Sequence, residues 1–161
     1  MIKQGLHTLY ETCKLILKRP SHVQVAALCY RQITKDATQY EVLLVTSRGT
    51  GRWIIPKGWV IPGKNGPQSA LQEAWEEAGV ETATVLPQPL GYYSYDKTLK
   101  TGLPLRIRAT VYAIHPTAMK KTFPECDQRK LKWVSPGEAA DLLDEPELKS
   151  ILRNFAPQYV S

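Results

Sequence analysis

The sequence is poor in cysteine and has no long apolar run, and each absence narrows the class of protein. Its three cysteines, Cys13, Cys29 and Cys126, are an odd number at wide spacings. They form neither a CxxC pair nor a disulfide framework, so we expect a cytoplasmic, reducing location. No apolar stretch approaches the roughly 20 residues that cross a bilayer, and a signal-peptide core is missing from the N-terminus. We therefore expect no membrane partner.

Acidic residues are outnumbered, and histidine is scarce. The chain has 21 Lys and Arg against 15 Asp and Glu, which gives a formal net charge of +6. A positive field attracts anions, but charge alone does not choose among nucleic acid, acidic lipid and a small polyphosphate. A basic surface without a role also remains open. The scattered His7, His22 and His115 indicate neither a ligand group nor a catalytic set.

The length of 161 residues predicts one domain, preceded by a short helical segment. Within residues 1–20, apolar side chains recur at helical spacing. They are Leu6, Leu9, Tyr10, Cys13, Ile16 and Leu17. We expect this amphipathic N-terminal helix to pack on a single domain over residues 21–161, and a membrane-surface helix is the alternative.

The rest of the chain alternates between strand and helix patterns. Strands are predicted over 23–30, 40–46, 90–95, 105–114 and 130–134, with a short apolar segment over 53–55. Helices are predicted over 67–78, after the N-cap residue Ser135, and over 147–155. Residues 47–52 and 57–67 are predicted to be loops. The fold class is therefore α/β or α+β, with a mixed sheet covered by helices.

The helix over 67–78 carries the most informative pattern. Glu73, Glu76 and Glu77 share one face, at the spacings i, i+3 and i+4. The other face is predicted to dock the helix through Leu71, Ala74, Trp75 and Ala78. Three carboxylates held this close repel one another, and a hard cation such as Mg²⁺ relieves that repulsion. A solvated acidic face is the alternative on this pattern alone.

A longer motif surrounds the glutamates. Segment 58–80 reads GWVIPGKNGPQSALQEAWEEAGV and resembles the Nudix hydrolase signature G-x5-E-x7-R-E-U-x-E-E-x-G-U, where U is a bulky aliphatic residue. The matching positions are Gly58, Glu73, Glu76, Glu77, Gly79 and Val80. The resemblance implies a Nudix-type α/β/α sandwich with a mixed β-sheet and an enzyme that hydrolyses phosphoanhydride bonds.

Three positions depart from the signature. Lys64 replaces the first glutamate, Gln72 the arginine and Ala74 the bulky aliphatic residue. In the family, that glutamate and arginine form a salt bridge that braces the loop against the helix. Both partners have changed here, which is milder than losing one, and a hydrogen bond from Lys64 to the Gln72 carbonyl is an available substitute.

The resemblance also covers the flanking segments, roughly residues 22–155. Segment 53–58 resembles the strand that enters the Nudix loop, where the backbone carbonyl of Lys57 is a further metal ligand by resemblance. Segment 123–140 resembles the diphosphoinositol polyphosphate and diadenosine polyphosphate hydrolases. The implied substrate is therefore a nucleoside-diphosphate-linked or highly phosphorylated small molecule.

The resemblance also implies a mechanism. Glu73, Glu76 and Glu77 would bind one to three Mg²⁺ ions, with Mn²⁺ as an alternative, and water would attack phosphorus. Glu76 is the first candidate for the general base, and Glu125 is the second. For Glu125, a plain surface glutamate is the alternative interpretation.

A polyphosphate substrate also needs cationic contacts. The candidates are Arg48, Arg52, Lys57, Lys64, Arg106 and Arg108. Each of them has the alternative of a solvated surface residue. Tyr92, Tyr93 and Tyr95 are placed either to stack on a base or to pack within a strand.

Two rival functions remain. The first is a Nudix-fold binding or regulatory module with weak catalysis, which the changes at Lys64 and Gln72 favour. The second is an RNA 5′-end pyrophosphohydrolase or RNA binder, although no RNA-binding motif is visible and the basic excess is modest. We expect no DNA partner, and the sequence leaves the oligomeric state open.

Overall fold

The computed structural model describes residues 22–35 and 39–156. The helix expected over residues 1–20 lies outside this part of the chain. No helix in the described part is long and apolar enough to cross a membrane.

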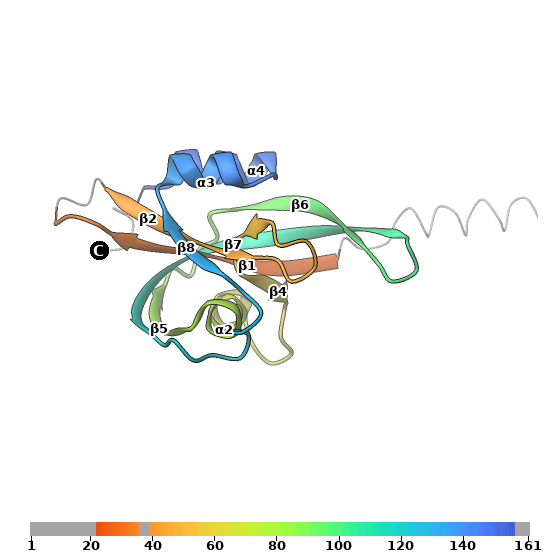
Figure 1. Ribbon diagram of the computed structural model, residues 1–161, viewed down its shortest axis with the longest axis horizontal. Helices are drawn as coiled ribbons and strands as arrows, with labels where there is room; N and C mark the ends of the chain where they lie inside the picture. The colour runs from red at the N-terminus through yellow and green to blue at the C-terminus, as the bar shows by residue number, and fades with distance from the viewer. Residues whose placement is uncertain (1–21, 36–38, 157–161) are drawn as a thin grey trace, which may run out of the picture.

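A mixed β-sheet forms the centre of the molecule (Figure 1). Its strands are β1 (His22–Gln32), β2 (Tyr40–Thr46), β3 (Trp53–Ile54), β4 (Lys57–Trp59), β5 (Val80–Val85), β6 (Gly91–Thr98), β7 (Pro104–Met119) and β8 (Leu131–Val134). The main path runs β3-β2-β1-β7-β5, while β4 pairs with β1, β6 with β7 and β8 with β2. The central strands β1 and β7 are parallel, and each of the other pairings is antiparallel.

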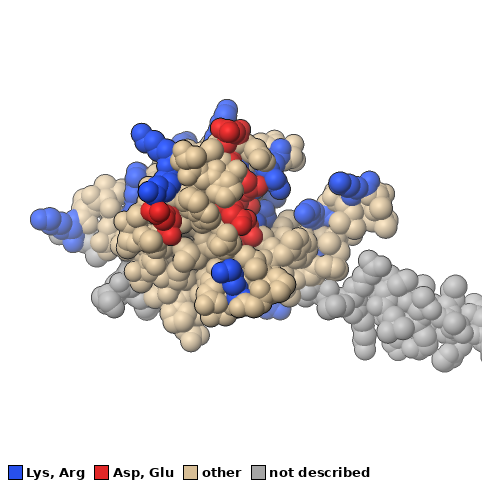
Figure 2. Space-filling model, turned by 90° about the horizontal axis from the view of Figure 1, so that it is seen from below, with Lys and Arg blue, Asp and Glu red and all other residues tan. Residues whose placement is uncertain are grey.

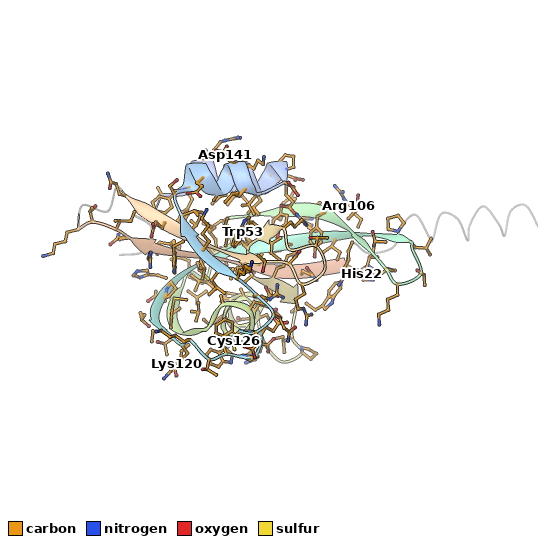
Figure 3. All side chains as sticks on the ribbon, viewed as in Figure 1. His22, Trp53, Arg106, Lys120, Cys126 and Asp141 are labelled. Atoms are coloured by element: carbon orange, nitrogen blue, oxygen red, sulfur yellow. The ribbon has the colours of Figure 1, made fainter. Side chains whose placement is uncertain are left out.

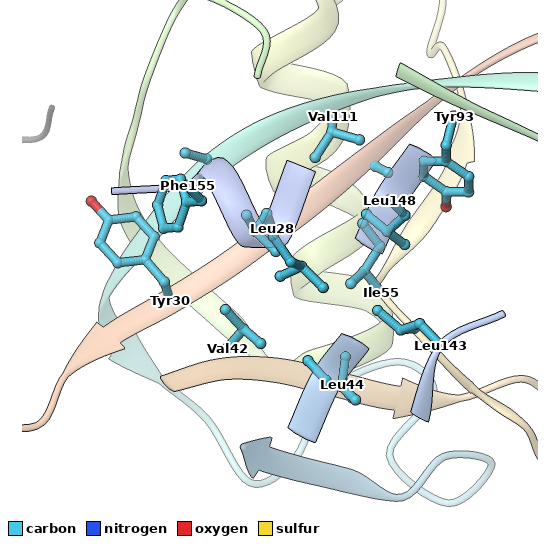
Figure 4. Close-up of a cluster of buried hydrophobic side chains, with 14 of the residues drawn as sticks. Leu28, Tyr30, Val42, Leu44, Ile55, Tyr93, Val111, Leu143, Leu148 and Phe155 are labelled. Atoms are coloured by element: carbon cyan, nitrogen blue, oxygen red, sulfur yellow. The ribbon is translucent and has the colours of Figure 1, made fainter. Parts of the chain in front are cut away.

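Helices cover both faces of this sheet. Helix α2 (Gly66–Ala78) lies on one face, and α3 (Pro136–Leu142) and α4 (Pro146–Asn154) lie on the other (Figure 1). Successive side chains of a strand point to opposite faces, so β1 supplies two cores. Ala26, Leu28 and Tyr30 pack toward α3 and α4 (Figure 4), and Val25, Ala27 and Cys29 pack toward α2. The predicted α/β/α sandwich is confirmed.

Helix α2 has well-defined ends. Asn65 caps it by accepting a hydrogen bond from the Gln68 N–H at 2.9 Å, and the Gln68 side chain accepts the Asn65 N–H at 3.0 Å. Gly79 ends the helix at φ 75°. A Cβ atom there would overlap the Lys120 carbonyl and the Phe123 ring, so the glycine lets the segment after β7 pack against the end of the helix.

The docking face of α2 differs from the prediction. Ala70, Ala74 and Ala78 are fully buried, whereas Trp75 is only half-buried. Seven residues make almost two turns of a helix, so Glu77 lies on the same side as Ala70 and is 5% exposed. Trp75 was the wrong anchor, because small alanines bring the helix backbone closer to the sheet than an indole would. The three glutamates therefore differ in burial, since Glu77 is buried while Glu73 and Glu76 are partly exposed.

Two strands differ from the prediction as well. Residues 57–59 form β4, where a loop was expected, and residues 80–85 form β5, for which no element was predicted. Both are held by partners distant in sequence, since β4 pairs with β1 and β5 pairs with β7. Local composition does not report such pairings.

Candidate active site

The three helical glutamates occupy different environments at the edge between α2 and β4. The Glu73 carboxylate lies against Gly58, where a Cβ atom would overlap it. Glu76 is half-buried, and its Oε1 accepts a hydrogen bond from the Gln72 side chain at 2.8 Å. Glu77 is buried, and its Oε2 accepts the backbone N–H of Lys57 at 3.3 Å. Gln72 thus supports Glu76, and the suggested bond from Lys64 to Gln72 does not form.

The loop before β8 brings a fourth carboxylate to this helix. The backbone N–H of Glu125 donates to the Glu76 carbonyl at 3.0 Å, which places Glu125 beside the glutamates of α2. Cys126, the next residue, is labelled beside α2 in Figure 3. Figure 2 views this side of the molecule and shows acidic side chains near the middle with basic ones around them.

Arg129, from the same loop, binds two of these carboxylates. Its Nη2 lies 2.8 Å from Glu77 Oε1, and its Nε lies 3.2 Å from Glu125 Oε2. Its Nη1 donates to the Thr46 carbonyl at 2.8 Å. The Arg129 side chain is only 5% exposed. Sequence reasoning missed it, because a lone arginine before a short strand carries no local signal of this contact.

The carboxylates shift one another's ionisation. Burial, together with the negative charges of Glu76 and Glu125, raises the pKa of Glu73 from 4.5 to about 7. Burial also raises the pKa of Glu77, and the opposing cations Arg129 and Lys57 limit that rise. For Lys57, burial lowers the pKa of the ammonium. Burial therefore disfavours the charged forms of Glu73 and Glu77, and at Glu77 the two cations oppose that effect.

The donors here fit a hard divalent cation. The candidates are carboxylate oxygens and a backbone carbonyl, which Mg²⁺ and Mn²⁺ prefer. Repulsion of Glu73 by Glu76 and Glu125 is the conflict that such a cation relieves. Among the described residues, no three His, Cys, Asp or Glu side chains already form a metal-binding group. The engagement of Glu77 by Arg129 is one reason, and a bound cation would have to compete with it.

A cleft of about 510 Å³ opens beside these residues. It is lined by Glu77, Lys57 and Arg129 at one side and by residues 95–98 of β6 at the other. The loop after β2, residues 47–50, also lines it. Of the glutamates described above, Glu77 alone is in the cleft lining, and the cleft extends from it to the end of β6.

Three of the six predicted phosphate ligands already bind carboxylates. Arg48 lines the cleft but lies 2.9 Å from Glu125, and Arg52 lines it but lies 2.9 Å from the buried Glu145. Arg106 is outside the cleft lining and pairs with Asp96 at 3.0 Å. It is labelled toward the β6–β7 hairpin, away from Cys126 (Figure 3).

Two further candidates lie elsewhere. The Arg108 guanidinium lies over the Tyr92 ring at 3.4 Å, outside the cleft lining. Lys64 lines a different groove, on the outer side of α2, with Leu71 and Trp75. The structure therefore does not bring Arg108 or Lys64 to the cleft.

Two lysines of the cleft lining lie beside aromatic rings, of which Tyr95 lines the cleft and Trp59 does not. The Lys57 ammonium lies 5.1 Å from the Tyr95 ring centre, and the Lys97 ammonium lies 5.8 Å from that of Trp59. The Tyr95 hydroxyl donates to Gln24 at 2.6 Å. Of the three tyrosines considered from the sequence, Tyr95 lines the cleft, Tyr93 is buried in the core, and Tyr92 is exposed beside Arg108.

Comparison with known proteins places these residues in a family. A model described as the NUDIX domain matches residues 22–155. The chain is 28% identical over 124 residues to bis(5'-nucleosyl)-tetraphosphatase [asymmetrical] of Sus scrofa, covering 73% of this chain and 80% of that protein. It is 31% identical over 123 residues to diphosphoinositol polyphosphate phosphohydrolase 3-beta of Homo sapiens, covering 74% of this chain and 68% of that protein.

Solved structures share the fold. The crystal structure of C. elegans Ap4A hydrolase matches with a TM-score of 0.60 at 24% identity, over 88% of this chain and 99% of that one. The E. coli dihydroneopterin triphosphate pyrophosphohydrolase matches with a TM-score of 0.62 at 22% identity, over 88% and 97% of the two chains. At these identities, the likeness supports the α/β/α architecture described above.

Proposed function

This chain belongs to the Nudix family and is a Nudix-type hydrolase, and on that premise we propose that it hydrolyses a phosphoanhydride bond of a dinucleoside polyphosphate. Mg²⁺, or Mn²⁺ in its place, is the proposed cofactor, in one to three ions. Its proposed ligands are Glu73, Glu76 and Glu77 of α2, together with the Lys57 carbonyl. We also propose that residues 21–161 are the Nudix domain and that residues 1–20 pack on it.

The observation that carries this proposal is that one cleft is lined both by Glu77, which adjoins Glu73 and Glu76 on α2, and by two lysines that lie beside aromatic rings. The carboxylates suit a metal ion, and Lys57 beside Tyr95 suits a phosphate next to a planar base. Lys97 beside Trp59 repeats that combination farther from α2. A chain of phosphates between two nucleosides presents both kinds of group.

The pairing of the cleft arginines favours this substrate over an inositol pyrophosphate. An inositol ring that carries phosphates on most of its carbons needs many unpaired cations around it. Arg48, Arg52 and Arg129 each contact a carboxylate within 3.0 Å. Lys57 and Lys97 are then the cations left to face a substrate, and a short polyphosphate requires fewer.

The chain's own groups supply positioning and proton transfer. A bound divalent cation would lower the pKa of water and screen phosphate charge. Glu76 is the proposed general base, because Gln72 fixes its Oε1 and leaves Oε2 to accept a proton from water. Glu125 is the second candidate, although Arg48 and Arg129 hold its two oxygens. Lys57 is placed to hold a phosphate oxygen of the leaving part.

The remaining aspects of the proposal have their own support. Cys29 and Cys126 are free thiols, which suits the reducing cytoplasm that we propose as the place of action. The relatives' names describe action on small polyphosphates, and this supports a small-molecule substrate rather than RNA.

The test is a substrate panel with Mg²⁺ that contains diadenosine tetraphosphate, an inositol pyrophosphate and triphosphorylated RNA. We expect kcat/KM to be at least about tenfold higher for diadenosine tetraphosphate and to fall by about 10²–10⁴ in Glu76→Gln. Glu138→Gln, which changes an exposed glutamate of α3, is the matched control. Unchanged turnover in Glu76→Gln would refute the assigned base. Preference for RNA would favour an RNA 5′-end pyrophosphohydrolase. Binding without turnover would favour a binding or regulatory module.

A further inference from the structure

The Arg129 guanidinium has two anchors that do not depend on Glu77. Its Nη1 donates to the backbone carbonyl of Thr46 at 2.8 Å, and its Nε donates to Glu125 Oε2 at 3.2 Å. A planar guanidinium held at two of its nitrogens has a fixed orientation. The position of Nη2 is therefore set by the loop and by β2, and it does not depend on the Glu77 side chain.

Glu77 is the partner that can leave. Its Oε1 lies 2.8 Å from Arg129 Nη2, while its Oε2 has a long contact of 3.3 Å with the Lys57 N–H. Glu77 also stands on α2 one residue after Glu76 and four after Glu73, in the row of carboxylates that suits a divalent cation. The Glu77 carboxylate can thus pair with either of two cations, the Arg129 guanidinium or a bound divalent metal ion.

We propose that Arg129 holds Glu77 until a divalent cation binds and then offers its freed Nη2 to a phosphate oxygen of the ligand. The inference rests on the metal site and the phosphate substrate of the proposed function. Glu77 and Arg129 both line the cleft, so an anion bound there lies beside this ion pair. Because the Arg129 side chain is 5% exposed, water compensates poorly for a lost carboxylate, and an anionic oxygen replaces it well.

The exchange couples the two ligands. Metal binding alone leaves Nη2 without its anion, and phosphate binding alone meets an Nη2 that Glu77 already occupies. When both bind, each cation has an anionic partner. The affinity for either ligand therefore rises when the other is present, and the two effects are equal by thermodynamic linkage.

The test measures binding rather than turnover. The dissociation constant of Mg²⁺ is determined calorimetrically for the full chain, with and without saturating methylenediphosphonate, a pyrophosphate analogue that water does not cleave. The probe also binds Mg²⁺ in solution, but to the same extent for every variant. Differences among variants therefore report the coupling between the two ligands on the protein. For the unmodified chain, and after correction for the Mg²⁺ that the probe binds in solution, we expect Mg²⁺ to bind about tenfold tighter with the probe than without it.

Variants of Arg129 give a result that a bracing role would not. In Arg129→Gln, Glu77 is released, so Mg²⁺ alone should bind several-fold tighter than in the unmodified chain, and the coupling should fall to within about twofold of none. If Arg129 only braced the site, its loss would weaken Mg²⁺ binding. Arg31→Gln, which removes an arginine paired with Glu41 outside the cleft, is the matched control and should change neither value.

A second variant covers the case in which Arg129→Gln fails to fold. Arg129→Lys keeps the charge, but one ammonium cannot reproduce the fixed three-nitrogen arrangement, so the coupling should fall at least about threefold. Coupling that persists in Arg129→Lys, or weaker Mg²⁺ binding in Arg129→Gln, overturns the inference. A chain that binds no Mg²⁺ overturns it together with the metal site. Coupling without turnover in the substrate panel contradicts the proposed function alone, and turnover without coupling contradicts the role of Arg129 alone.

Discussion

The carboxylate of Glu73 lies against the backbone of Gly58, so close that a Cβ atom on residue 58 would overlap it. The first glycine of the motif and its first helical glutamate, fifteen residues apart, are thus neighbours at the edge where β4 meets α2. Residue 58 must be glycine because the Glu73 carboxylate fills the space that a Cβ atom would occupy.

Gly58→Ala should therefore displace the Glu73 carboxylate while the fold remains. A displacement of about 1 Å at a catalytic group costs on the order of 10² in rate, so kcat/KM should fall by about that factor. Steady-state kinetics and circular dichroism measure the two effects. Gly137→Ala is the control, because no atom lies within 4 Å of a Cβ placed there. Full activity in Gly58→Ala would contradict the close approach.

The metal-free chain should lose stability as the pH rises through the window set by Glu73. Its pKa is about 7 in the folded chain against 4.5 for an ordinary glutamate, so the folded state binds more protons than the unfolded state between these values. Stability from this group is present below about pH 4.5 and is lost as the pH approaches 7 and passes it.

Thermal unfolding in the presence of a chelator, followed across this window, measures that loss. Added Mg²⁺ should flatten the dependence, because a bound cation replaces the protons. Glu73→Gln should flatten it as well, since the amide stays neutral. If the chelated chain gains stability across this window, Glu73 is not destabilised in its charged form.

Arg52 should matter more for stability than for substrate binding. It bonds Asp144 at 3.3 Å and Glu145 at 2.9 Å, where α4 begins, and Glu145 is only 7% exposed. Arg52→Gln leaves that buried carboxylate without its cation, which should cost about 2 kcal/mol of the free energy of unfolding, while KM changes less than about threefold. Chemical denaturation and kinetics separate the two effects.

The exposed pair of Arg106 with Asp96 provides the comparison for Arg52. With both side chains more than 60% exposed, Arg106→Gln should cost no more than about 1 kcal/mol. Equal losses in the two variants would show that the burial of Glu145 has no effect on the strength of its pairing.

Trp59→Ala should weaken the binding of a nucleoside-containing substrate. Trp59 is 43% exposed, and its ring lies beside Lys97, which lines the cleft. Stacking of a base on an aromatic ring contributes about 1–3 kcal/mol, so KM for diadenosine tetraphosphate should rise about 5- to 100-fold. Inhibition by inorganic tripolyphosphate, which has no base, should not change. Tyr92→Ala is the control, since Tyr92 is exposed like Trp59 but packs with Arg108, which does not line the cleft. If Trp59→Ala weakens the binding of diadenosine tetraphosphate and of tripolyphosphate equally, Trp59 acts on the phosphate chain and not on a base.

The sequence was sufficient for features that repeat along one element. The spacing of Glu73, Glu76 and Glu77 located α2, and Gly79 located its end, because both depend on helical geometry alone. Segments rich in Val, Leu and Ala located β1 and β2. Segment 80–85, VETATV, carries β-branched residues at alternate positions and contained a strand signal that was overlooked.

The partners of these elements could not be predicted in the same way. The burial of Glu77 depends on which side of α2 meets the sheet, and alanines and a tryptophan both fit a helix pattern. The pairing of Arg52 with Glu145 joins residues 93 positions apart. Arg129 is recognisable only after the loop before β8 is placed beside α2. Three of the predicted phosphate ligands, Arg48, Arg52 and Arg106, were read as unpaired because sequence does not show the acidic side chains beside them.

The parallel pairing of β1 with β7 also sets an order of events during synthesis. Residues 22–29 of β1 pair with residues 107–114 of β7, and β5 and β6 use the same β7 as their partner. A nascent chain that has emerged from the ribosome only as far as Leu103 therefore has the residues of α2 and of β1 but lacks β7. Three strands are then left with an open edge, which is a template for aggregation. Until β7 has left the exit tunnel those edges stay open, and slow translation after β6 has emerged would lengthen that exposure.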